Sequence, residues 1–405
     1  MSSLLPPEIE QLIAAQMPDL VRIRHDLHAH PQIGFEETVA ARIVQEELGL
    51  AGVPFQANVA TTGVVGWLIP EGMEGRDAVA LRADMDALPL QEETGLLYAS
   101  EVEGRMHACG HDGHVAILIG AARVLARLRE RLPRPVKLVF QPAEEGLGGA
   151  KVMLDAGVLT EKVGRLKVGA IYALHGWPTL PVGTLGTRTG PLMAGADRFE
   201  IVIHGKGGHG AMPHRAVDPI VAAAQVVVAL QTVVSRNIDP TAQAVVTVGQ
   251  CHAGTAINII PESATLAGTI RTLEDSVAEH VHRRLSAVAQ HVAAGMGCSA
   301  DVRIKRDFPV TVNAPAATEF VRRVARDVLG EQAVRDQSVT MGSEDFSFLS
   351  AVVPGCYFFL GLRPAGQQDY PAVHSPRFDF NDEAILPGVR MMVALGLAAA
   401  ETLGA

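Results

Sequence analysis

Apolar residues along the chain form two kinds of pattern, which alternate. Continuous runs of strand length lie at 64–69, 78–82, 136–140, 168–174 and 356–362. Helical spacing of apolar residues fills 7–27, 38–48, 115–132, 316–329 and 385–403. Continuous apolar runs are typical of strands that are buried on both faces, and strands that alternate with helices are typical of α/β domains. The pattern therefore predicts an α/β fold whose mixed sheet is flanked by helices.

The middle of the chain follows a different order. After a run rich in glycine and threonine at 183–190, the pattern predicts strand, helix, two strands, helix and strand at 198–204, 218–236, 244–250, 263–271, 276–294 and 300–308. This βαββαβ order predicts a two-layer domain of the ferredoxin-like kind. We therefore expect a principal domain made of 1–188 and 313–405, with a second domain, 189–312, inserted into it.

The densest chemistry lies at 107–114, which reads His-Ala-Cys-Gly-His-Asp-Gly-His. In an extended segment Cys109 and His111 leave on the same side, and His111 and His114 have the spacing of one helix face. A thiolate with an imidazole suits a borderline-soft divalent ion such as zinc, with cobalt, nickel and manganese as alternatives. The other interpretation is a buried free cysteine beside loop histidines.

Further polar residues follow the predicted strands. They are Asp84, Asp86, Glu144, Glu145 and His175. In open α/β sheets, ligands bind beyond the carboxyl ends of the parallel strands, where separate loops converge. We therefore expect these residues to meet Cys109 and His111 at one place.

The pair Glu144 and Glu145 suits hydrolysis at a metal. One carboxylate can bind the metal while its neighbour accepts a proton from water and passes it to a leaving amine. The other interpretation is a solvated acidic pair at the start of a helix. His175 and His374 are in the same way either metal ligands or ordinary core histidines.

The inserted domain has its own candidates. His209 and His214 lie in a glycine-rich segment, 205–214, where His209 can donate a hydrogen bond to a developing oxyanion or hold a carboxylate. Asn258 and Arg271 are polar residues among apolar ones, so each either contacts substrate or satisfies buried backbone. Arg271 is the natural candidate for a substrate carboxylate, because guanidinium binds carboxylate in a bidentate fork. A plain turn is the alternative for the glycine-rich segment.

Composition narrows the function and the partners. The formal net charge is -10, which provides no broad basic surface, so we expect a small-molecule substrate and no nucleic acid. Four scattered cysteines suggest a reducing compartment. The first 20 residues do not resemble a signal peptide, and no uninterrupted apolar run reaches membrane-spanning length. We therefore expect a cytoplasmic protein without a membrane partner.

Eight short motifs together resemble the M20 family of metallopeptidases and amidohydrolases. They lie in order at 82–89, 107–114, 141–146, 173–177, 207–214, 258–261, 341–346 and 373–376. More narrowly, the set is similar to the branch that contains hippurate hydrolase, aminoacylase-like enzymes and plant indole-acetyl-amino-acid hydrolases. This resemblance implies a zinc-peptidase-like catalytic domain with an inserted domain that forms the dimer contact and closes over the substrate.

The resemblance also implies roles for individual residues. Two divalent metal ions, Zn, Mn, Co or Ni, would be held by Cys109, His111, Glu145, His175 and His374. Glu144 would be the general base and later the acid, and His209 would polarise the scissile carbonyl, often from the partner subunit of a homodimer. Asn258 matches a substrate-contacting position, and His214, in the same motif as His209, is expected to contact substrate too.

One departure from the family pattern lies at Arg82, where many relatives have a metal-binding histidine. We therefore expect Asp84 to orient other side chains rather than to act in catalysis. The predicted activity is hydrolysis of N-acyl amino acids to a carboxylic acid and a free amino acid. The alternatives are a dipeptidase or carboxypeptidase with the same two-metal centre, and a non-catalytic binding module on this fold.

Overall fold

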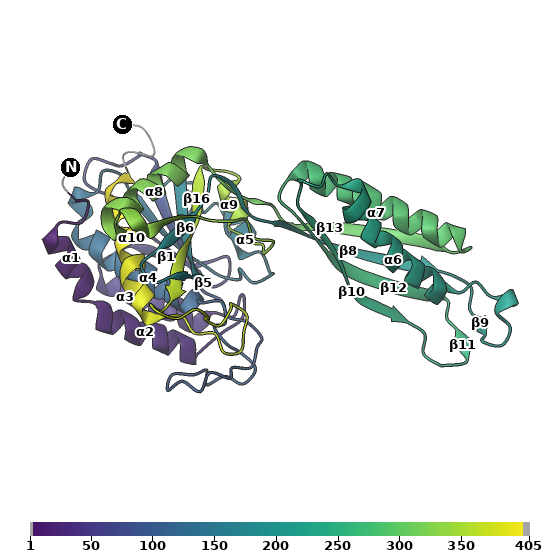
Figure 1. The fold of residues 1–405 in the computed structure, drawn as a ribbon. Helices are drawn as coiled ribbons and strands as arrows, with labels where there is room; N and C mark the ends of the chain where they lie inside the picture. Colours follow the sequence, from purple (N-terminus) through teal and green to yellow (C-terminus); the bar gives the residue numbers. More distant parts are fainter. Residues whose placement is uncertain (1–2, 400–405) are drawn as a thin grey trace. The chain divides into compact units, whose positions relative to one another are not determined.

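The computed structural model describes residues 3–399 and divides the chain into two compact units. The first comprises Met1–Leu192, Val312–Ser338 and Asp345–Ala405, and the second Met193–Thr311 and Val339–Glu344. The second unit thus also takes in the short segment Val339–Glu344, which lies late in the chain. Each unit combines helices with a β-sheet (Figure 1).

The first unit is built on a mixed sheet of eight strands in the order β1-β2-β4-β3-β5-β16-β6-β15. Their bounds are β1 Phe55–Val59, β2 Gly63–Leu68, β3 Ala78–Asp84, β4 Val136–Gln141, β5 Val168–Pro181, β6 Leu185–Thr187, β15 Val334–Asp336 and β16 Gly355–Arg363. The four central strands β4, β3, β5 and β16 are parallel to one another, whereas β2 and β6 on either side of them are antiparallel to β4 and β16. Their carboxyl ends therefore share one edge, where the polar residues that follow them gather.

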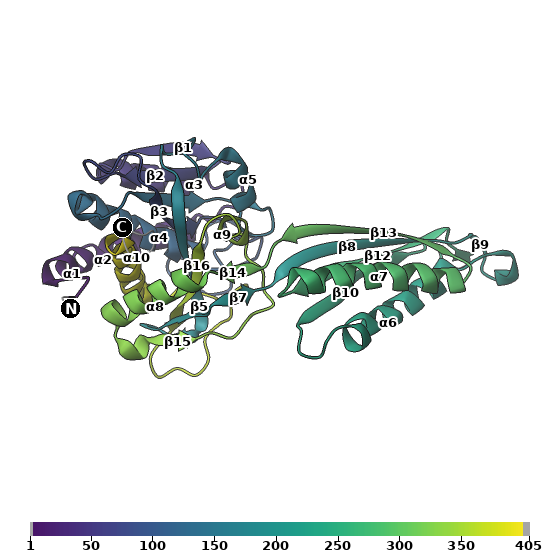
Figure 2. The same ribbon diagram turned by 90° about the horizontal axis from the view of Figure 1, so that it is seen from above.

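Helices flank this sheet (Figures 1 and 2). They are α1 Pro7–Ala14, α2 Met17–Ala29, α3 Thr38–Leu50, α4 His111–Arg127, α5 Gly149–Ala156, α8 Pro315–Leu329, α9 Ser347–Ser350 and α10 Ile385–Leu397, with short 3-10 helices at Arg129–Arg131, Glu331–Ala333 and Asp382–Ala384. Helix α4 packs closely between α2 and α10, because a Cβ at Gly120 would lie 2.6 Å from Leu20 and 2.9 Å from Val389. The predicted α/β architecture with a mixed sheet and flanking helices is confirmed.

Three predicted helix bounds are wrong. The single helix expected at 7–27 is two helices, because Pro18 lacks the N–H that a continuous helix would need and lies instead in the first turn of α2. Helix α4 begins at His111 rather than at residue 115 and ends at Arg127. Helix α10 ends at Leu397, and the last four residues of the expected helix, 400–403, lie outside the described residues.

The second unit has a four-stranded antiparallel sheet in the order β10-β12-β8-β13. Its elements are β8 Gly195–His204, α6 Pro219–Asn237, β10 Ala244–Ala253, β12 Ser263–Thr272, α7 Asp275–Gly295 and β13 Ser299–Phe308. A small ribbon pairs β9 Gly208–His209 with β11 Ile259–Ile260, followed by a 3-10 turn at Pro213–Arg215. Another ribbon, β7 Gly190–Met193 with β14 Thr311–Asn313, lies where the chain passes between the units. The predicted βαββαβ order is therefore present.

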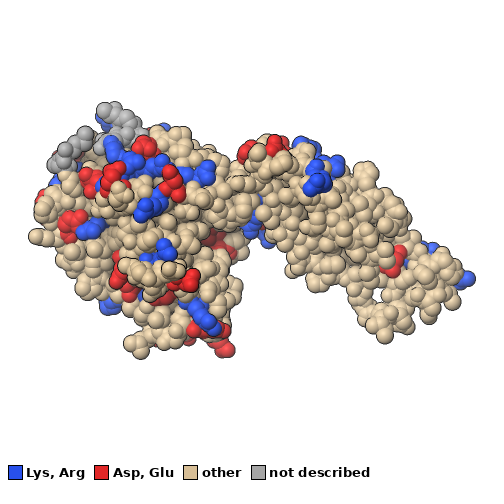
Figure 3. All heavy atoms as spheres, in the orientation of Figure 1, with Lys and Arg blue, Asp and Glu red and all other residues tan. Residues whose placement is uncertain are grey.

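Helix α6 is unusually apolar on both sides. Val226 and Leu230 are buried against the sheet, whereas Val221 and Val228 are 51% and 66% exposed. Of the described helices, α6 alone is long and apolar enough to cross a membrane by length and composition. Figure 3 shows few charged side chains on the face of this unit that carries the helices. A helix that covers a sheet can be as long and as apolar as a membrane-spanning helix, so length and composition do not tell these two kinds of helix apart.

Candidate metal centre

The structure brings together five side chains that the sequence predicts as metal ligands, all in the first unit. These side chains form three overlapping groups, and within each group the potential ligand atoms lie within 4.8 Å of one another. The groups are Cys109 with His111 and His175, Cys109 with Glu145 and His374, and His111 with Glu144 and Glu145. The shared members join these groups into one cluster at the carboxyl edge of the parallel strands. The same cluster includes Glu144, the predicted general base.

Local backbone geometry positions the ligands. Gly110 has a φ of 88° and lies against Phe380, so that the chain turns between Cys109 and the first residue of α4. His374 has a φ of 64°, and its N–H donates to the carbonyl oxygen of Ala108 at 2.7 Å. The loop that carries His374 is thereby fixed next to Cys109. The resulting contacts are 3.2 Å from Cys109 Sγ to His175 Nε2 and 3.2 Å from His374 Nε2 to Glu145 Oε1.

Hydrogen bonds orient two of the imidazoles toward the cluster. His111 Nδ1 donates to the backbone oxygen of Asp86 at 2.9 Å, and His175 Nδ1 donates to the backbone oxygen of Gly176 at 2.8 Å. These bonds assign the proton to Nδ1, which leaves the Nε2 lone pair of each ring for a metal. His111 Nε2 is buried without a hydrogen-bond partner, as expected of an atom that is placed to bind an ion. The residues therefore fit the predicted metal centre.

The electrostatics of the cluster favour a cation. Burial raises the pKa of the Cys109 thiol, and Glu145 and Glu144 raise it further. Burial lowers the pKa of His111, but Asp84 and Asp86 outweigh this and raise it to about 10. The neighbouring carboxylates thus stabilise a positive charge at the His111 ring. A divalent ion would supply that charge and would hold Cys109 as a thiolate.

Asp84 is hydrogen-bonded to one neighbour in the sheet and to one in α4. Its Oδ1 accepts a hydrogen bond from His114 Nδ1 at 2.6 Å, and its Oδ2 accepts one from Arg82 at 2.6 Å. His114 Nε2 in turn accepts from the N–H of Gly176 at 2.8 Å. Asp84, His111 and His114 have ligand atoms within 4.8 Å of one another, but both ring nitrogens of His114 are already used. Burial opposes ionisation of Asp84, yet His111 and Arg82 hold its pKa well below the usual range.

Glu144 lies directly before the ligand candidate Glu145 and is 6% exposed. Its Oε1 accepts the N–H of Asp345 at 3.4 Å, and a carboxylate oxygen lies within 4.8 Å of a ring nitrogen of His111. A carboxylate beside a metal centre can accept a proton from water there. The geometry is therefore compatible with the base role, which stays a prediction.

Two further buried acids make contacts near the centre: Asp86, which the sequence predicts at this edge without a role of its own, and Glu37, which the sequence did not indicate. Asp86 accepts the N–H of Glu145 at Oδ2, at 2.9 Å, while its backbone oxygen holds His111. Its position two residues after Asp84, just past the end of β3, was the available signal. Glu37, at the start of α3, accepts the N–H of Ala143 at 2.8 Å. A local sequence pattern gives no sign of that contact.

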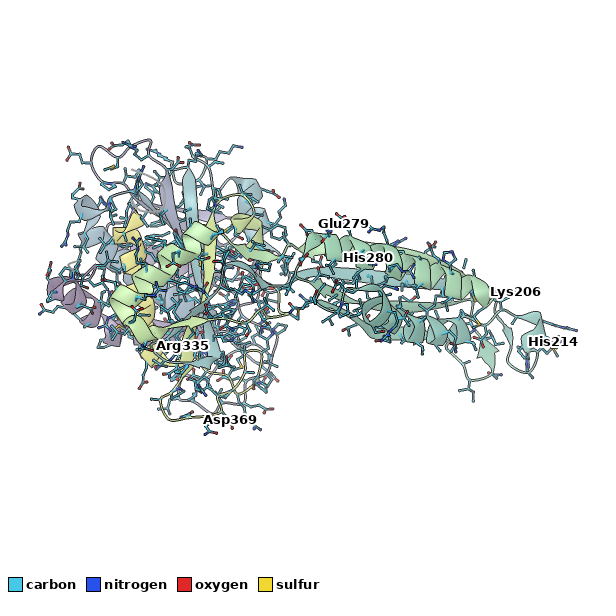
Figure 4. The ribbon with its side chains drawn as sticks, turned by 45° about the horizontal axis from the view of Figure 1, so that its top comes forward. Lys206, His214, Glu279, His280, Arg335 and Asp369 are labelled. Atoms are coloured by element: carbon cyan, nitrogen blue, oxygen red, sulfur yellow. The ribbon has the colours of Figure 1, made fainter. Side chains whose placement is uncertain are left out.

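The candidates of the inserted domain lie in the second unit, in two places. His209 and Asn258 come together at the β9–β11 ribbon, where the N–H of Gly210 donates to the backbone oxygen of Asn258 at 2.8 Å. His214 is exposed and lies at the tip of this unit (Figure 4). Arg271 lies near the other end of β12 and donates to the Ser343 hydroxyl. The structure therefore groups His209 with Asn258 and leaves Arg271 apart from them.

Comparisons with known proteins agree with this centre. A profile described as Peptidase family M20/M25/M40 matches residues 80–398. IAA-amino acid hydrolase ILR1-like 2 of Arabidopsis thaliana is 39% identical over 382 residues, which cover 93% of this chain and 84% of that protein. N-acetylcysteine deacetylase of Bacillus subtilis (strain 168) is 39% identical over 393 residues, 95% of this chain and 97% of that protein. The crystal structure of the Bacillus subtilis YXEP protein, described as a dinuclear metal binding peptidase from the M20 family, matches with a TM-score of 0.83 and 35% identity over 96% of this chain and 99% of that chain. With a family profile over most of its length and near full-length relatives, the chain belongs to peptidase family M20/M25/M40.

Proposed function

We propose that the protein is a metal-dependent amidohydrolase that hydrolyses the amide bond of N-acyl amino acids. The observation that carries the proposal is the pair of a buried Glu144 and a partly buried Glu145 inside a cluster of thiol and imidazole ligands. The names of the relatives support it, since one is a hydrolase of IAA-amino acids and another a deacetylase of N-acetylcysteine. The products are a carboxylic acid and a free amino acid.

The proposed centre holds two divalent ions through Cys109, His111, Glu145, His175 and His374. When bound, the ions would polarise the amide carbonyl and lower the pKa of a bound water. Glu144 would accept the proton of the attacking water on a carboxylate oxygen and would then deliver it to the leaving nitrogen. Glu145 is unsuited to that task because its Oε1 faces His374 and its carboxylate is proposed as a ligand.

The substrate contacts are proposed for the inserted domain. His209 would donate a hydrogen bond to the developing oxyanion, in its own or in the partner subunit's site. Arg271 would bind the substrate carboxylate as a bidentate fork, and Asn258 and His214 would make further polar contacts. The acyl group would be of the benzoyl, acetyl or indole-acetyl type, as in hippurate hydrolase and its relatives.

We also propose the finer properties that the sequence indicates. Zinc, manganese, cobalt or nickel would fit the mixed set of thiolate, imidazole and carboxylate ligands. The protein would work in the cytoplasm, where its four free cysteines would stay reduced. It would form a homodimer or a higher homo-oligomer, and the exposed apolar side of α6 is compatible with such a contact.

The proposal is tested on protein that has been stripped with a chelator and then loaded with one metal at a time. Release of free amino acid is measured from N-acetyl, N-benzoyl and indole-acetyl amino acids. Glu144→Gln should retain its metal and lose about a thousandfold in kcat, since general acid–base catalysis contributes roughly 10²–10⁴-fold. Glu145→Gln is the matched control and should lose metal as well as activity. An active Glu144→Gln protein would contradict the proposed base.

A peptidase with the same centre is the second candidate, because the structurally similar Bacillus subtilis protein is described as a peptidase. Free dipeptides therefore belong in the same assay. Cleavage of dipeptides without release from any capped amino acid would support this second candidate. Metal binding without turnover of either substrate class would instead support a non-catalytic binding module.

A further inference from the structure

The turn between β4 and α5, residues 142–147, presents both Glu144 and Glu145. It is tightly built, because the N–H of Gly146 donates to the oxygen of Glu144 at 2.7 Å and the N–H of Gly149 donates to the oxygen of Ala143 at 2.9 Å. Ala143 has a φ of 56°, in the left-handed region. A non-glycine residue there costs about 1–2 kcal/mol, so the surrounding structure must hold it.

Glu37 provides one of the contacts that hold this turn. Its side chain is fully buried, and its Oε1 accepts the N–H of Ala143 at 2.8 Å. Its other oxygen accepts the hydroxyl of Thr62. Glu37 belongs to the segment 28–37, and the groups of candidate ligand atoms around the metal centre do not include it. A buried carboxylate without hydrogen bonds would cost folding free energy, and the two bonds of Glu37 offset that cost. One of these bonds is made to Ala143, the residue directly before Glu144.

Neighbouring contacts hold the turn from two further sides. A Cβ at Gly34 would lie 2.9 Å from both Cα and Cβ of Ala143, so the chain before Glu37 packs directly on the turn. On the far side of Glu144, the buried carboxylate of Asp86 accepts the N–H of Glu145 at 2.9 Å. Two buried carboxylates therefore bind the backbone N–H groups immediately before and after Glu144.

We propose that Glu37 is a positioning residue for hydrolysis, which fixes the left-handed turn at Ala143 and thereby the direction of the Glu144 carboxylate. The proposal rests on the proposed function for the role of Glu144 as base. Glu37 acts only through the backbone of Ala143 and does not touch the reacting atoms. Loss of this hold would misdirect Glu144, while the bond from the N–H of Glu145 to Asp86 keeps Glu145 in place and the other proposed ligands come from other segments.

Three variants separate this role from a general contribution to folding. Glu37→Met keeps a similar volume and removes both acceptor atoms. Glu37→Gln keeps an acceptor for the Ala143 N–H and turns an amide donor to the Thr62 hydroxyl. Thr62→Val is the matched control, because it removes the other bond of Glu37 and leaves the one to Ala143.

Since a misplacement of about 1 Å can cost on the order of 10²-fold in rate, we expect Glu37→Met to lose about 10- to 100-fold in kcat. Its KM should stay within about twofold and its metal content unchanged, because the lost interaction concerns the transition state. Glu37→Gln and Thr62→Val should stay within about threefold of the parent kcat, since both keep the bond to Ala143. A Glu37→Met protein with parental kcat, or a Thr62→Val protein with the same loss as Glu37→Met, would overturn the proposal.

A measurement without metal or substrate tests the contact itself. Hydrogen exchange followed by mass spectrometry on the metal-free protein should show faster exchange in the peptide containing Ala143 for Glu37→Met, and parental exchange for Thr62→Val. Unchanged exchange in Glu37→Met would refute the hold on the turn. If Glu37→Met does not fold, Gly34→Ala takes its place, because its new methyl group would press on Ala143. Parental kcat and exchange in Gly34→Ala would then count against the proposal.

Glu144→Gln, assayed beside these variants, keeps the two proposals distinguishable. If Glu144→Gln is inactive and Glu37→Met is fully active, the positioning role of Glu37 fails while the proposed function stands. If Glu144→Gln is active, the base assignment fails, and with it the catalytic part of the role of Glu37. The exchange measurement then still decides whether Glu37 holds the turn.

Discussion

Lys137 provides a sharp test of how the first unit is stabilised. It is the second residue of β4 and is fully buried, opposite Trp67 of β2. Its ammonium donates to the backbone oxygens of four residues in the loop before β5, at 2.5–3.1 Å: Val158, Thr160, Val163 and Leu166. A single ammonium group thus provides a hydrogen-bond donor for four carbonyl groups of one loop. Replacement by methionine would keep the volume and remove every one of these bonds.

The expected loss of stability follows from two opposing effects. Burial lowers the pKa of Lys137 from 10.5 to about 8, so the ammonium form persists at pH 7 at a cost of about 3 kcal/mol. Each hydrogen bond from a charged donor contributes about 1.5–3 kcal/mol, and carbonyl groups left unpaired in the interior carry a further penalty. Because methionine would leave four carbonyl oxygens of the loop without their donor, Lys137→Met should lower the free energy of unfolding by about 2–5 kcal/mol despite the cost of burying the ammonium.

Urea unfolding followed by tryptophan fluorescence measures this change in the first unit alone, because Trp67 and Trp177 are the two tryptophans of the chain and both lie there. Lys167→Met is the matched control. The Lys167 side chain is 59% exposed and pairs only loosely with Asp77, at 3.4 Å, so its loss should change the free energy by less than about 0.5 kcal/mol. If the two lysine variants unfold at the same urea concentration, the carbonyl contacts do not stabilise the fold as argued.

Three further predictions concern charge. Burial lowers the pKa of His28, but hydrogen bonds to Asp112 and Glu92 raise it to about 9, so its contribution is complete below pH 6.5 and lost as the pH rises through 9. Urea unfolding of metal-free protein should therefore show a fall of stability across this window that His28→Gln lacks. Because burial raises the pKa of Cys109, metal binding should release the thiol proton and tighten as the pH rises, which calorimetry in buffers of different ionisation enthalpy measures. Cys109→Ser should lack this proton, while His111, whose pKa is also raised, still releases its own. Arg82→Met leaves two buried carboxylates without their shared cation and should cost about 3–5 kcal/mol in urea unfolding.

The fold was predictable wherever burial is uniform along an element. Strands such as β3 and β4 are buried at every position, so a continuous apolar run reveals them. The start of α4 was missed because its first turn is polar in sequence and yet fully buried, with His111 and His114 held by hydrogen bonds. The break before Met17 was missed because helical spacing of apolar residues continues across it. The pattern of apolar residues predicts which apolar positions are buried, but it does not predict polar side chains that are buried because they bind one another.

The candidate site was predictable to the extent that strand ends define it. Glu145 follows β4 and His175 lies within β5, so strand topology alone brings them to one edge. The bond between Glu37 and Ala143 joins positions 106 residues apart, which no local pattern encodes. The same holds for His374, whose place depends on a backbone bond to Ala108 and which the sequence indicated only through its motif.

Arg82 links the departure from the family pattern to the chemistry of the centre. Guanidinium has only donors, so Arg82 cannot itself bind a metal ion. It donates instead to Asp84 and to Asp345, and Asp84 in turn orients His114, which accepts the N–H that follows His175. One buried cation thus orders the sheet edge behind the proposed centre. Burial raises the pKa of the thiol of Cys109, one of the proposed ligands, so the affinity of the proposed centre for metal should fall as the pH is lowered.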